Sequence, residues 1–285
     1  MSGRDAPARG VLLAIATERL LAAGVESAAY DANALLAFVL GVPRTRLALV
    51  TEVSGAQAEE FGHLVGRRAS REPLQHLTGV AHFRHVELAV GPGVFVPRPE
   101  TELLAGWAAE QASVLDAPVV VDLGTGSGAI AKSVAHEVPA ARVHAVEIDR
   151  SAHVWATRNL AGTGVDLRQG DLADAFGDLA GAVDVVVSNP PYIPHEAWES
   201  VAVEVRDHDP ELALYATGDG LDTIRAVERR AALLLRPGGV VGVEHADVQG
   251  ESAPGVFSRT RRWEQVRDHE DLTGRARFLT ARLAR

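Results

Sequence analysis

Residues 118–128 read PVVVDLGTGSG, and this stretch decides the fold. The valine run is typical of a strand buried in a parallel sheet, and the glycines then open a turn. A helix is expected over residues 129–137, a second strand over 142–148 and a second helix over 151–160. A strand, a glycine loop, a helix and a second strand in this order predict an α/β domain with a parallel sheet.

The glycine loop comprises Gly124, Thr125, Gly126, Ser127 and Gly128. Glycine allows the backbone to come close to a ligand, and the start of the following helix offers free N–H groups. Glu147 near the end of the second strand is placed to accept both hydroxyls of a ribose. A lone glycine loop is weak evidence, and the alternative is a plain turn. A glycine loop that is followed in order by a helix, a strand and this acid indicates an adenosine-containing ligand.

Two further residues extend the expected nucleoside site. A short third strand is predicted over residues 165–168, and Asp171 and Leu172 follow it. An acid and an apolar side chain at this edge of the sheet are placed to flank an adenine ring.

Residues 188–192 read SNPPY and follow the apolar run at 183–187, which is expected to be a buried strand. Two prolines end that strand and stiffen its exit, because each ring fixes φ and removes an N–H. The carbonyls of Asn189 and Pro190 are expected to lack ladder partners, and the Asn189 side chain adds an acceptor. Three acceptors beside the ring of Tyr192 suit a planar NH2 group. The alternative is an ordinary strand end with a turn asparagine.

The rest of the chain predicts three domain segments: helices over residues 1–79, a β-hairpin linker over 80–96 and a catalytic domain over 97–285. The N-terminal segment holds expected helices at 6–23, 28–40 and 54–71. The catalytic segment adds helices at 102–115 and 221–235, a strand at 240–244 and a closing hairpin near 263–266 and 277–283.

Composition excludes several classes of protein. The 285 residues are 47% hydrophobic and 23% charged, which is typical of a soluble globular protein. Cysteine is absent, so disulfides and thiolate chemistry are excluded, and the 11 histidines lack paired acids, so no metal site is predicted. No apolar stretch has the length of a membrane span, and a cytoplasmic protein is expected. The net charge of −10 argues against DNA binding.

Five motifs occur in a fixed order: REPLQ at 71–75 with LTG at 77–79, VPRPETE at 96–102, DLGTGSG at 122–128, NPPY at 189–192 and DGLD at 219–222. With them the chain resembles the peptide chain release factor glutamine methyltransferases, the PrmC/HemK family, over nearly its whole length. Three residues depart from the usual pattern of this family. Glu147 stands where Asp is usual, His76 where Tyr is usual and His245 where Gly is usual.

The resemblance implies a class I S-adenosylmethionine-dependent methyltransferase with a Rossmann-like seven-stranded sheet and an N-terminal helical substrate-recognition domain. The expected reaction methylates the side-chain amide nitrogen of the glutamine in the Gly-Gly-Gln motif of release factors. The glycine loop would hold the methionine part of the cofactor and Glu147 its ribose. In the motif Asn189, Pro190, Pro191 and Tyr192, the oxygens of the first two would orient the substrate amide and the tyrosine would pack on it. Asn189 is also expected to border the cofactor.

Four alternatives follow from shared motifs. A DNA adenine N6-methyltransferase also uses Asn-Pro-Pro-Tyr, but the acidic charge and the missing basic domain argue against it. A ribosomal-protein glutamine methyltransferase is excluded only by the overall pattern of the sequence. A NAD-dependent dehydrogenase needs a catalytic pair that the only lysine, Lys132, is poorly placed to supply. A non-catalytic nucleotide-binding module has no need of the rigid Asn-Pro-Pro-Tyr exit. Release factors are the expected partners, with no membrane and no direct DNA contact.

Overall fold

The computed structural model describes residues 8–200 and 202–285. Contacts within the chain divide it into two compact units. The smaller unit takes in the residues up to Val80 together with Ala202–His208, and the larger unit takes in Ala81–Val201 and Asp209–Arg285. The sequence gives no sign that residues 202–208 join helices from the other end of the chain.

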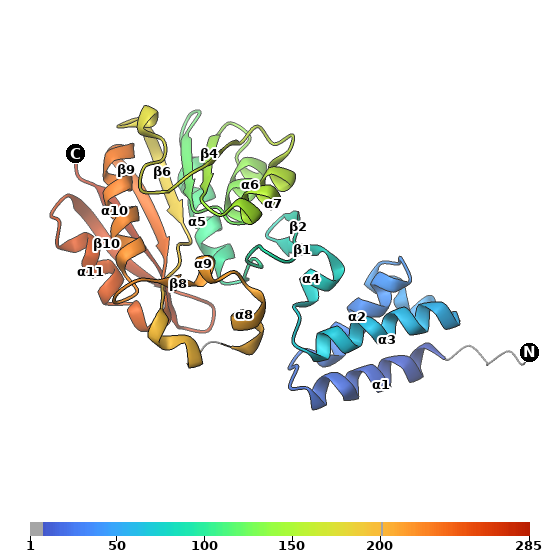
Figure 1. The fold of residues 1–285 in the computed structure, drawn as a ribbon. Helices are drawn as coiled ribbons and strands as arrows, with labels where there is room; N and C mark the ends of the chain where they lie inside the picture. The colour runs from blue at the N-terminus through green and yellow to red at the C-terminus, as the bar shows by residue number, and fades with distance from the viewer. Residues whose placement is uncertain (1–7, 201) are drawn as a thin grey trace, which may run out of the picture. The chain divides into compact units, whose positions relative to one another are not determined.

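The smaller unit is helical, as predicted (Figure 1). Ser54 begins its longest helix with a capping box, in which Gln57 N–H donates to Ser54 Oγ at 3.3 Å and Ser54 N–H donates to Gln57 Oε1 at 3.0 Å. Apolar side chains of several helices form its core, Leu20, Leu35, Leu36 and Phe61 among them. Its elements are α1 (Arg9–Ala22), α2 (Ala28–Val39), a 3-10 helix (Arg44–Leu49), α3 (Gly55–Ala69), α4 (Leu74–Thr78) and α8 (Val203–His208).

A buried ion-pair cluster lies inside this unit. Arg68 of α3 donates to Asp31 of α2 at 2.6 Å and contacts Glu204 of α8 at 2.9 Å. Both Arg68 and Asp31 are buried. Charges removed from water are stabilised only by such partners, so this cluster ties α2, α3 and α8 together.

The larger unit is built on a seven-stranded sheet with the order β10-β11-β9-β6-β3-β4-β5 (Figure 1). The strands from β9 to β5 run parallel, whereas β11 is antiparallel to both β9 and β10. This confirms the predicted class I methyltransferase sheet with a closing hairpin. The strands are β3 (Val119–Leu123), β4 (Arg142–Glu147), β5 (Asp166–Gln169), β6 (Val183–Ser188), β9 (Leu235–Glu244), β10 (Trp263–Glu270) and β11 (Ala276–Leu283).

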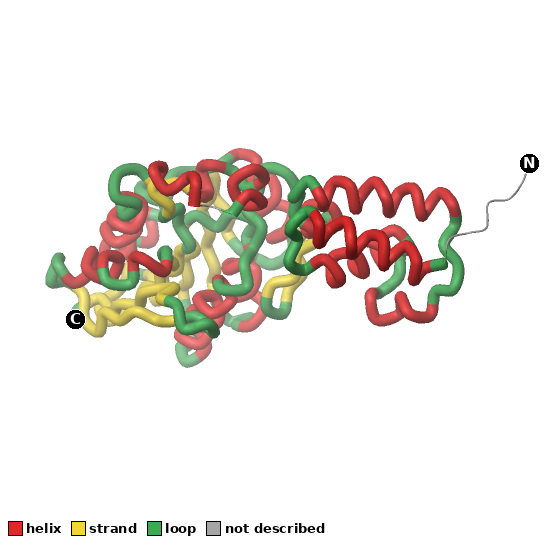
Figure 2. Tube along the Cα trace, turned by 90° about the horizontal axis from the view of Figure 1, so that it is seen from below, coloured by secondary structure: helices red, strands yellow, loops and turns green. Residues whose placement is uncertain are grey.

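Helices cover both faces of this sheet (Figures 1 and 2). Successive strand residues face opposite sides, so Val120 joins one core while Val119 and Val121 join the other. The first core packs against α5 (Thr101–Ser113), α6 (Ala129–Glu137) and α7 (Arg150–Leu160). The second packs against α10 (Asp222–Leu234) and α11 (Ser252–Ser258). The near-continuous valine strands are explained by burial on both sides.

Two smaller sheets complete the larger unit. The hairpin expected near residues 80–96 is present as β1 (Val80–Phe83) and β2 (Val86–Ala89). The second small sheet pairs β7 (Ile193–Pro194) in parallel with β8 (Tyr215–Ala216), and the sequence does not predict it. Residues between these two strands include a 3-10 helix (His195–Ser200) and α9 (Glu211–Leu214).

The ion-pair cluster yields a stability prediction. Arg68→Ala leaves Asp31 buried without its partner, and we expect a loss of about 3–5 kcal/mol. Arg67→Ala is the matched control on the same helix, because the Arg67–Glu72 pair is exposed and should contribute under about 1 kcal/mol. Urea unfolding of the full chain, followed by hydrogen exchange of the α2 and α3 amides, measures both. Equal losses in the two variants would contradict the role of the buried pair.

Candidate active site

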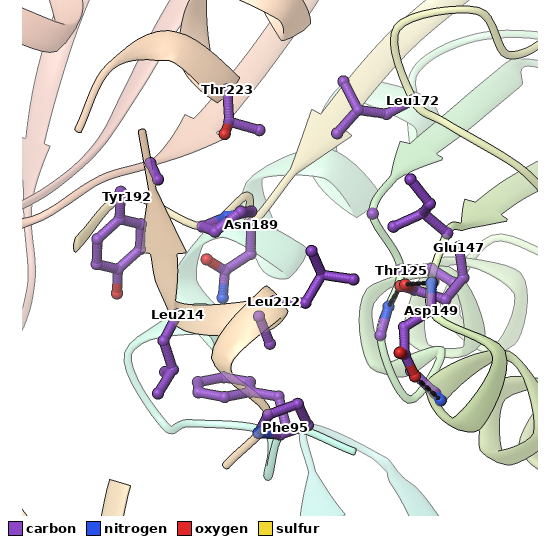
Figure 3. Close-up of a pocket in the computed structure, with 18 of the residues that line it drawn as sticks. Phe95, Thr125, Glu147, Asp149, Leu172, Asn189, Tyr192, Leu212, Leu214 and Thr223 are labelled. Atoms are coloured by element: carbon purple, nitrogen blue, oxygen red, sulfur yellow. Dashed lines mark hydrogen bonds between the residues drawn. The ribbon is translucent and has the colours of Figure 1, made fainter. Parts of the chain in front are cut away.

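A cavity of about 430 Å³ opens at the carboxyl ends of β3, β4, β5 and β6 (Figure 3). Parallel strands present their carboxyl ends at one edge of a sheet, and ligands of such folds bind there. The cavity is lined entirely by residues of the larger unit. Figure 3 shows Glu147, Thr125 and Leu172 on one side of it, with Asn189 and Tyr192 on the other.

The glycine loop forms one wall of the cavity. Gly124 and Thr125 donate their N–H groups to Val146 O at 3.0 and 2.9 Å, which holds the loop against the end of β4. Gly126 has a φ of +57°, a conformation that favours glycine, and it lines the cavity. Gly128 allows α6 to pack closely on α7, because a Cβ at this position would lie 3.0 Å from Leu160.

Glu147 is fixed at the end of β4 by backbone donors. Its Oε2 accepts the N–H of Gly126 at 2.7 Å, and its Oε1 accepts the N–H of Asp149 at 2.8 Å. Burial raises the pKa of this carboxyl, while the two backbone hydrogen bonds oppose the shift. The carboxylate therefore shapes the glycine loop and still presents lone pairs to the cavity.

A second carboxyl lies beneath the loop. Asp122 Oδ2 accepts the Thr125 hydroxyl at 2.6 Å and the Ala131 N–H at 3.2 Å. Burial raises the pKa of Asp122 to about 7. This residue anchors the loop to the start of α6 from below, since it is not part of the cavity lining.

Asn189 comes directly after β6 and lines the cavity. Its Nδ2 donates to Thr101 Oγ1 at 3.2 Å, a contact that joins residues 88 positions apart. The amide nitrogen of the asparagine is thus engaged by the protein, and its oxygen remains to accept a hydrogen bond from a ligand. Thr101 is buried at the start of α5 and also borders the cavity.

Tyr192 closes the same motif and also lines the cavity. Its hydroxyl donates to Glu244 Oε1 at 3.4 Å, at the end of β9. Burial and the Glu244 carboxylate both raise the pKa of Tyr192, so the phenol stays protonated. The ring therefore has a fixed hydroxyl end and a face available for packing.

The wall beside Asn189 includes residues that sequence reasoning missed. Phe95 and Pro97 contribute from the stretch before α5, and Leu212 and Leu214 contribute from α9. An ion pair between Arg98 and Asp209 joins these two segments, and Asp209 Oδ1 also accepts the Val96 N–H at 3.3 Å. In the sequence, only the motif at residues 96–102 indicated a part of this wall. Nothing in the sequence predicted the contribution of α9.

The charge of the cavity is one-sided. Four carboxylates line it, those of Glu147, Asp149, Asp171 and Asp222, and the described lining residues include no Lys, Arg or His. Of the four, Asp222 pairs with Arg225 at 2.8 Å outside the lining. A cationic ligand is favoured in such a place, and a polyphosphate is disfavoured.

The structure brings most of the predicted site residues together. The cavity lining includes Gly124, Thr125, Gly126, Ser127, Glu147, Asp171, Leu172, Asn189, Pro191 and Tyr192. Gly128 and Pro190 are not among the residues that line it, and Pro190 is buried.

Within residues 8–200 and 202–285, no group of three or more His, Asp or Glu side chains is arranged to hold a metal ion. Over the same residues, no helix combines the length and apolar character needed to cross a bilayer.

Three comparisons connect this geometry with known proteins. A release factor glutamine methyltransferase of Streptomyces coelicolor is 56% identical over 274 residues, which cover 95% of this chain and 97% of the relative. A 4-amino-L-phenylalanine/4-methylamino-L-phenylalanine methyltransferase of Streptomyces pristinaespiralis is 43% identical, covering 92% and 91%. A 16S rRNA N2 G1207 methyltransferase from T. thermophilus, solved with AdoMet and guanosine, shares the fold at a TM-score of 0.51 and 22% identity, covering 72% of this chain and 50% of that one.

Family models match both units. Residues 12–79 match the PrmC N-terminal domain, and residues 99–207 match the methyltransferase small domain. The full-length match to the Streptomyces coelicolor relative joins these two domains in one protein of similar length. The chain belongs to the release factor glutamine methyltransferase family.

Proposed function

We propose that this protein transfers a methyl group to the side-chain amide nitrogen of the glutamine in the Gly-Gly-Gln loop of peptide chain release factors. The observation that supports this proposal best is the orientation of Asn189. Its Nδ2 donates to Thr101, and its Oδ1 is left to accept a hydrogen bond from the substrate. The family supports the choice of release factors over other proteins. The proposal places the enzyme in the cytoplasm, where translation takes place.

An amide nitrogen is a poor nucleophile, because its lone pair is delocalised into the carbonyl. Asn189 Oδ1, at the cavity, would accept one N–H bond of the glutamine amide and fix its direction. The Pro190 carbonyl is the predicted acceptor of the second N–H bond, although Pro190 is buried and is not among the residues that line the cavity. Tyr192 would pack on the planar amide. Pro191, which lines the cavity, stiffens the motif. Proximity and oriented hydrogen bonds account for the catalysis, and no strong general base is required.

The methyl donor is S-adenosylmethionine, which supplies a methyl group activated by a positively charged sulfur. The residues present fit this group, since the cavity is lined by four carboxylates and a glycine wall. Glu147 would accept the ribose hydroxyls, and the loop Gly124 to Ser127 would hold the methionine part. Asp171 and Leu172 would border the adenine, and Asn189 would lie where cofactor and substrate meet.

The absence of cations from the described cavity lining also bears on the alternatives. A DNA methyltransferase must hold phosphates near the flipped base, and four carboxylates at the cavity disfavour them. We assign residues 1–79 to recognition of the release factor, the hairpin at 80–96 to the link between the domains and residues 97–285 to catalysis. In this division, residues 1–79 would supply the binding energy for the release factor that the small cavity lacks alone.

An aromatic amine is the second candidate substrate. The Streptomyces pristinaespiralis relative is named for such a substrate, and an aniline NH2 is also planar. Its identity of 43%, against 56% for the release factor enzyme, makes the amine the lesser candidate.

Glu147→Ala tests the cofactor site. Loss of a carboxylate that accepts hydrogen bonds should weaken S-adenosylmethionine binding by about 1–3 kcal/mol. Glu147→Asp, which retains the carboxylate and introduces the usual family residue, should keep most of the affinity. Isothermal titration measures both, with thermal melting to check the loop that Glu147 supports. Unchanged affinity in Glu147→Ala would place the ribose elsewhere.

Asn189→Ala tests substrate orientation. Cofactor affinity should stay near normal, while kcat for release factor should fall about 10²–10³-fold, the cost of losing one oriented polar contact. Asn33→Ala in α2, which also removes a side-chain amide, serves as the control outside the cavity. Turnover close to that of the wild type would remove Asn189 from the reaction.

The substrate is tested by labelling. We expect enzyme incubated with methyl-labelled S-adenosylmethionine and release factor to label the loop glutamine, and peptide mass spectrometry locates the mark. Parallel reactions contain DNA, ribosomal protein, 4-amino-L-phenylalanine, or release factor with the loop glutamine replaced by alanine. Label in any of these parallel reactions, with none on the loop glutamine, would overturn the proposal.

A further inference from the structure

The Asn-Pro-Pro-Tyr motif needs a support at each end if Asn189 and Tyr192 are to meet a substrate in a fixed direction. The two prolines between them fix φ, so a shift of either end is passed on to the whole motif. At its start, Ser188 Oγ donates to Leu123 O of β3 at 2.6 Å, and Ser188 is buried. This contact fixes the entry to the motif, and the Tyr192 end requires a support of its own.

Gln249 supplies the support at the Tyr192 end. Its Nε2 donates to the main-chain oxygen of Tyr192 at 3.1 Å and to that of Gly220 at 3.4 Å. Its Oε1 accepts the N–H of Ala246 at 3.0 Å. Gln249 is 5% exposed. One buried amide thus joins the substrate motif, the DGLD motif at 219–222 and the segment that follows β9.

The direction of this amide is settled by its partners. The oxygen and the NH2 group of a glutamine have nearly the same shape, so neighbouring groups decide their places. Ala246 offers an N–H, which only the oxygen accepts, and Tyr192 and Gly220 offer carbonyls, which only the NH2 group satisfies. Main-chain groups cannot exchange these roles. A side chain at position 249 therefore needs both an acceptor and a donor to make all three contacts.

Gly220 allows the DGLD motif to come close to this contact. Its φ is +80°, and a Cβ at this position would lie 2.8 Å from Tyr192 O and 2.9 Å from Gln249 Nε2. A larger residue would press on both atoms of the hydrogen bond between Gln249 and Tyr192. The glycine of the DGLD motif is therefore explained by close approach to the end of the substrate motif.

The base of Gln249 is itself fixed. Gln249 ends a 3-10 helix that begins at Asp247, and its N–H donates to Ala246 O at 2.8 Å. The buried ring of His245 bridges the same segment to β10, with Nδ1 at 2.9 Å from Ala246 O and Nε2 at 2.8 Å from Asp268 Oδ1. The amide of Gln249 is thus presented from a segment tied to the closing hairpin.

We propose that Gln249 and Gly220 are positioning residues, which hold the main-chain carbonyl of Tyr192 and thereby fix the Asn-Pro-Pro-Tyr motif against the substrate. This inference rests on the proposed amide methylation, in which Asn189 and Tyr192 contact the substrate. The described residues that line the cavity include neither Gln249 nor Gly220, so both act through the motif.

Two variants remove the support in different ways. Gln249→Met keeps the length of the side chain and removes both its donor and its acceptor. Gln249→Glu keeps an oxygen for the Ala246 N–H and places a second oxygen against the two carbonyls, so it separates the donor contact from support of the 3-10 helix. Glu228→Met is the control, because Glu228 is a similarly buried residue of the larger unit that accepts from Trp263 Nε1.

A matched pair of glycines tests the close approach. Gly220→Ala adds a Cβ against Tyr192 O at a φ of +80°, and Gly164→Ala adds one at a φ of +79° with no atom within 4 Å. Both variants carry the same backbone strain, so only the contact with the motif differs between them. Should Gln249→Met fail to fold, this pair still decides the question.

The measurements are kcat and KM for methylation of release factor by the full chain at saturating cofactor, with cofactor affinity and melting temperature. We expect kcat to fall at least about tenfold in Gln249→Met and Gly220→Ala, because misplaced reacting groups lose rate steeply. Gln249→Glu should also lose kcat. Cofactor affinity should not change in any of them, and KM for release factor should change less than kcat. Glu228→Met and Gly164→Ala should retain kcat even where they melt at a lower temperature.

Three results would overturn the inference and leave the proposed function intact. The first is normal kcat in Gln249→Met, and the second is a kcat in Gly220→Ala equal to that in Gly164→Ala. The third is a loss of kcat that is matched in Glu228→Met or accompanied by weaker cofactor binding, since either would show a general effect on the fold. Failure of the wild-type enzyme to methylate release factor would instead count against the proposed function.

Discussion

The parallel pairing of β3 with β4 on one side and β6 on the other is the constraint on which the site depends. It brings the glycine loop, Glu147 and Asn189 to one edge of the sheet, although they are separated by up to 65 positions in the chain. The valine strands make this pairing stable, because they are buried between two helical layers. The residues that line the cavity therefore lie mostly in short segments at the ends of these strands.

Buried carboxyl groups recur around this edge with separate tasks. Asp122 secures the loop from beneath, Glu147 shapes it from the side and Glu244 lies behind the substrate motif. Burial raises the pKa of each of them. Together with the acidic cavity lining, they make a site suited to a cationic methyl donor and a neutral amide.

The sequence was sufficient for features that depend on local pattern. Continuous valine runs predicted the strands, glycine and proline marked their ends, and the quoted motifs predicted most of the residues that line the cavity. Contacts over long separations could not be predicted in this way. Thr101 meets Asn189 across 88 positions and Arg98 meets Asp209 across 111, and neither pair has a local signature. The wall formed by α9 was also missed, because a helix of four residues has no periodicity to detect.

We propose that the cavity orients a primary amide with the oxygen of Asn189. A crystal structure of the enzyme with S-adenosylhomocysteine and a peptide containing Gly-Gly-Gln tests it most directly. We expect the glutamine NH2 group at about 2.7–3.2 Å from Asn189 Oδ1, with Asn189 Nδ2 still donating to Thr101. A glutamine bound away from Asn189, or an Asn189 that meets it with Nδ2, would contradict this role of Asn189.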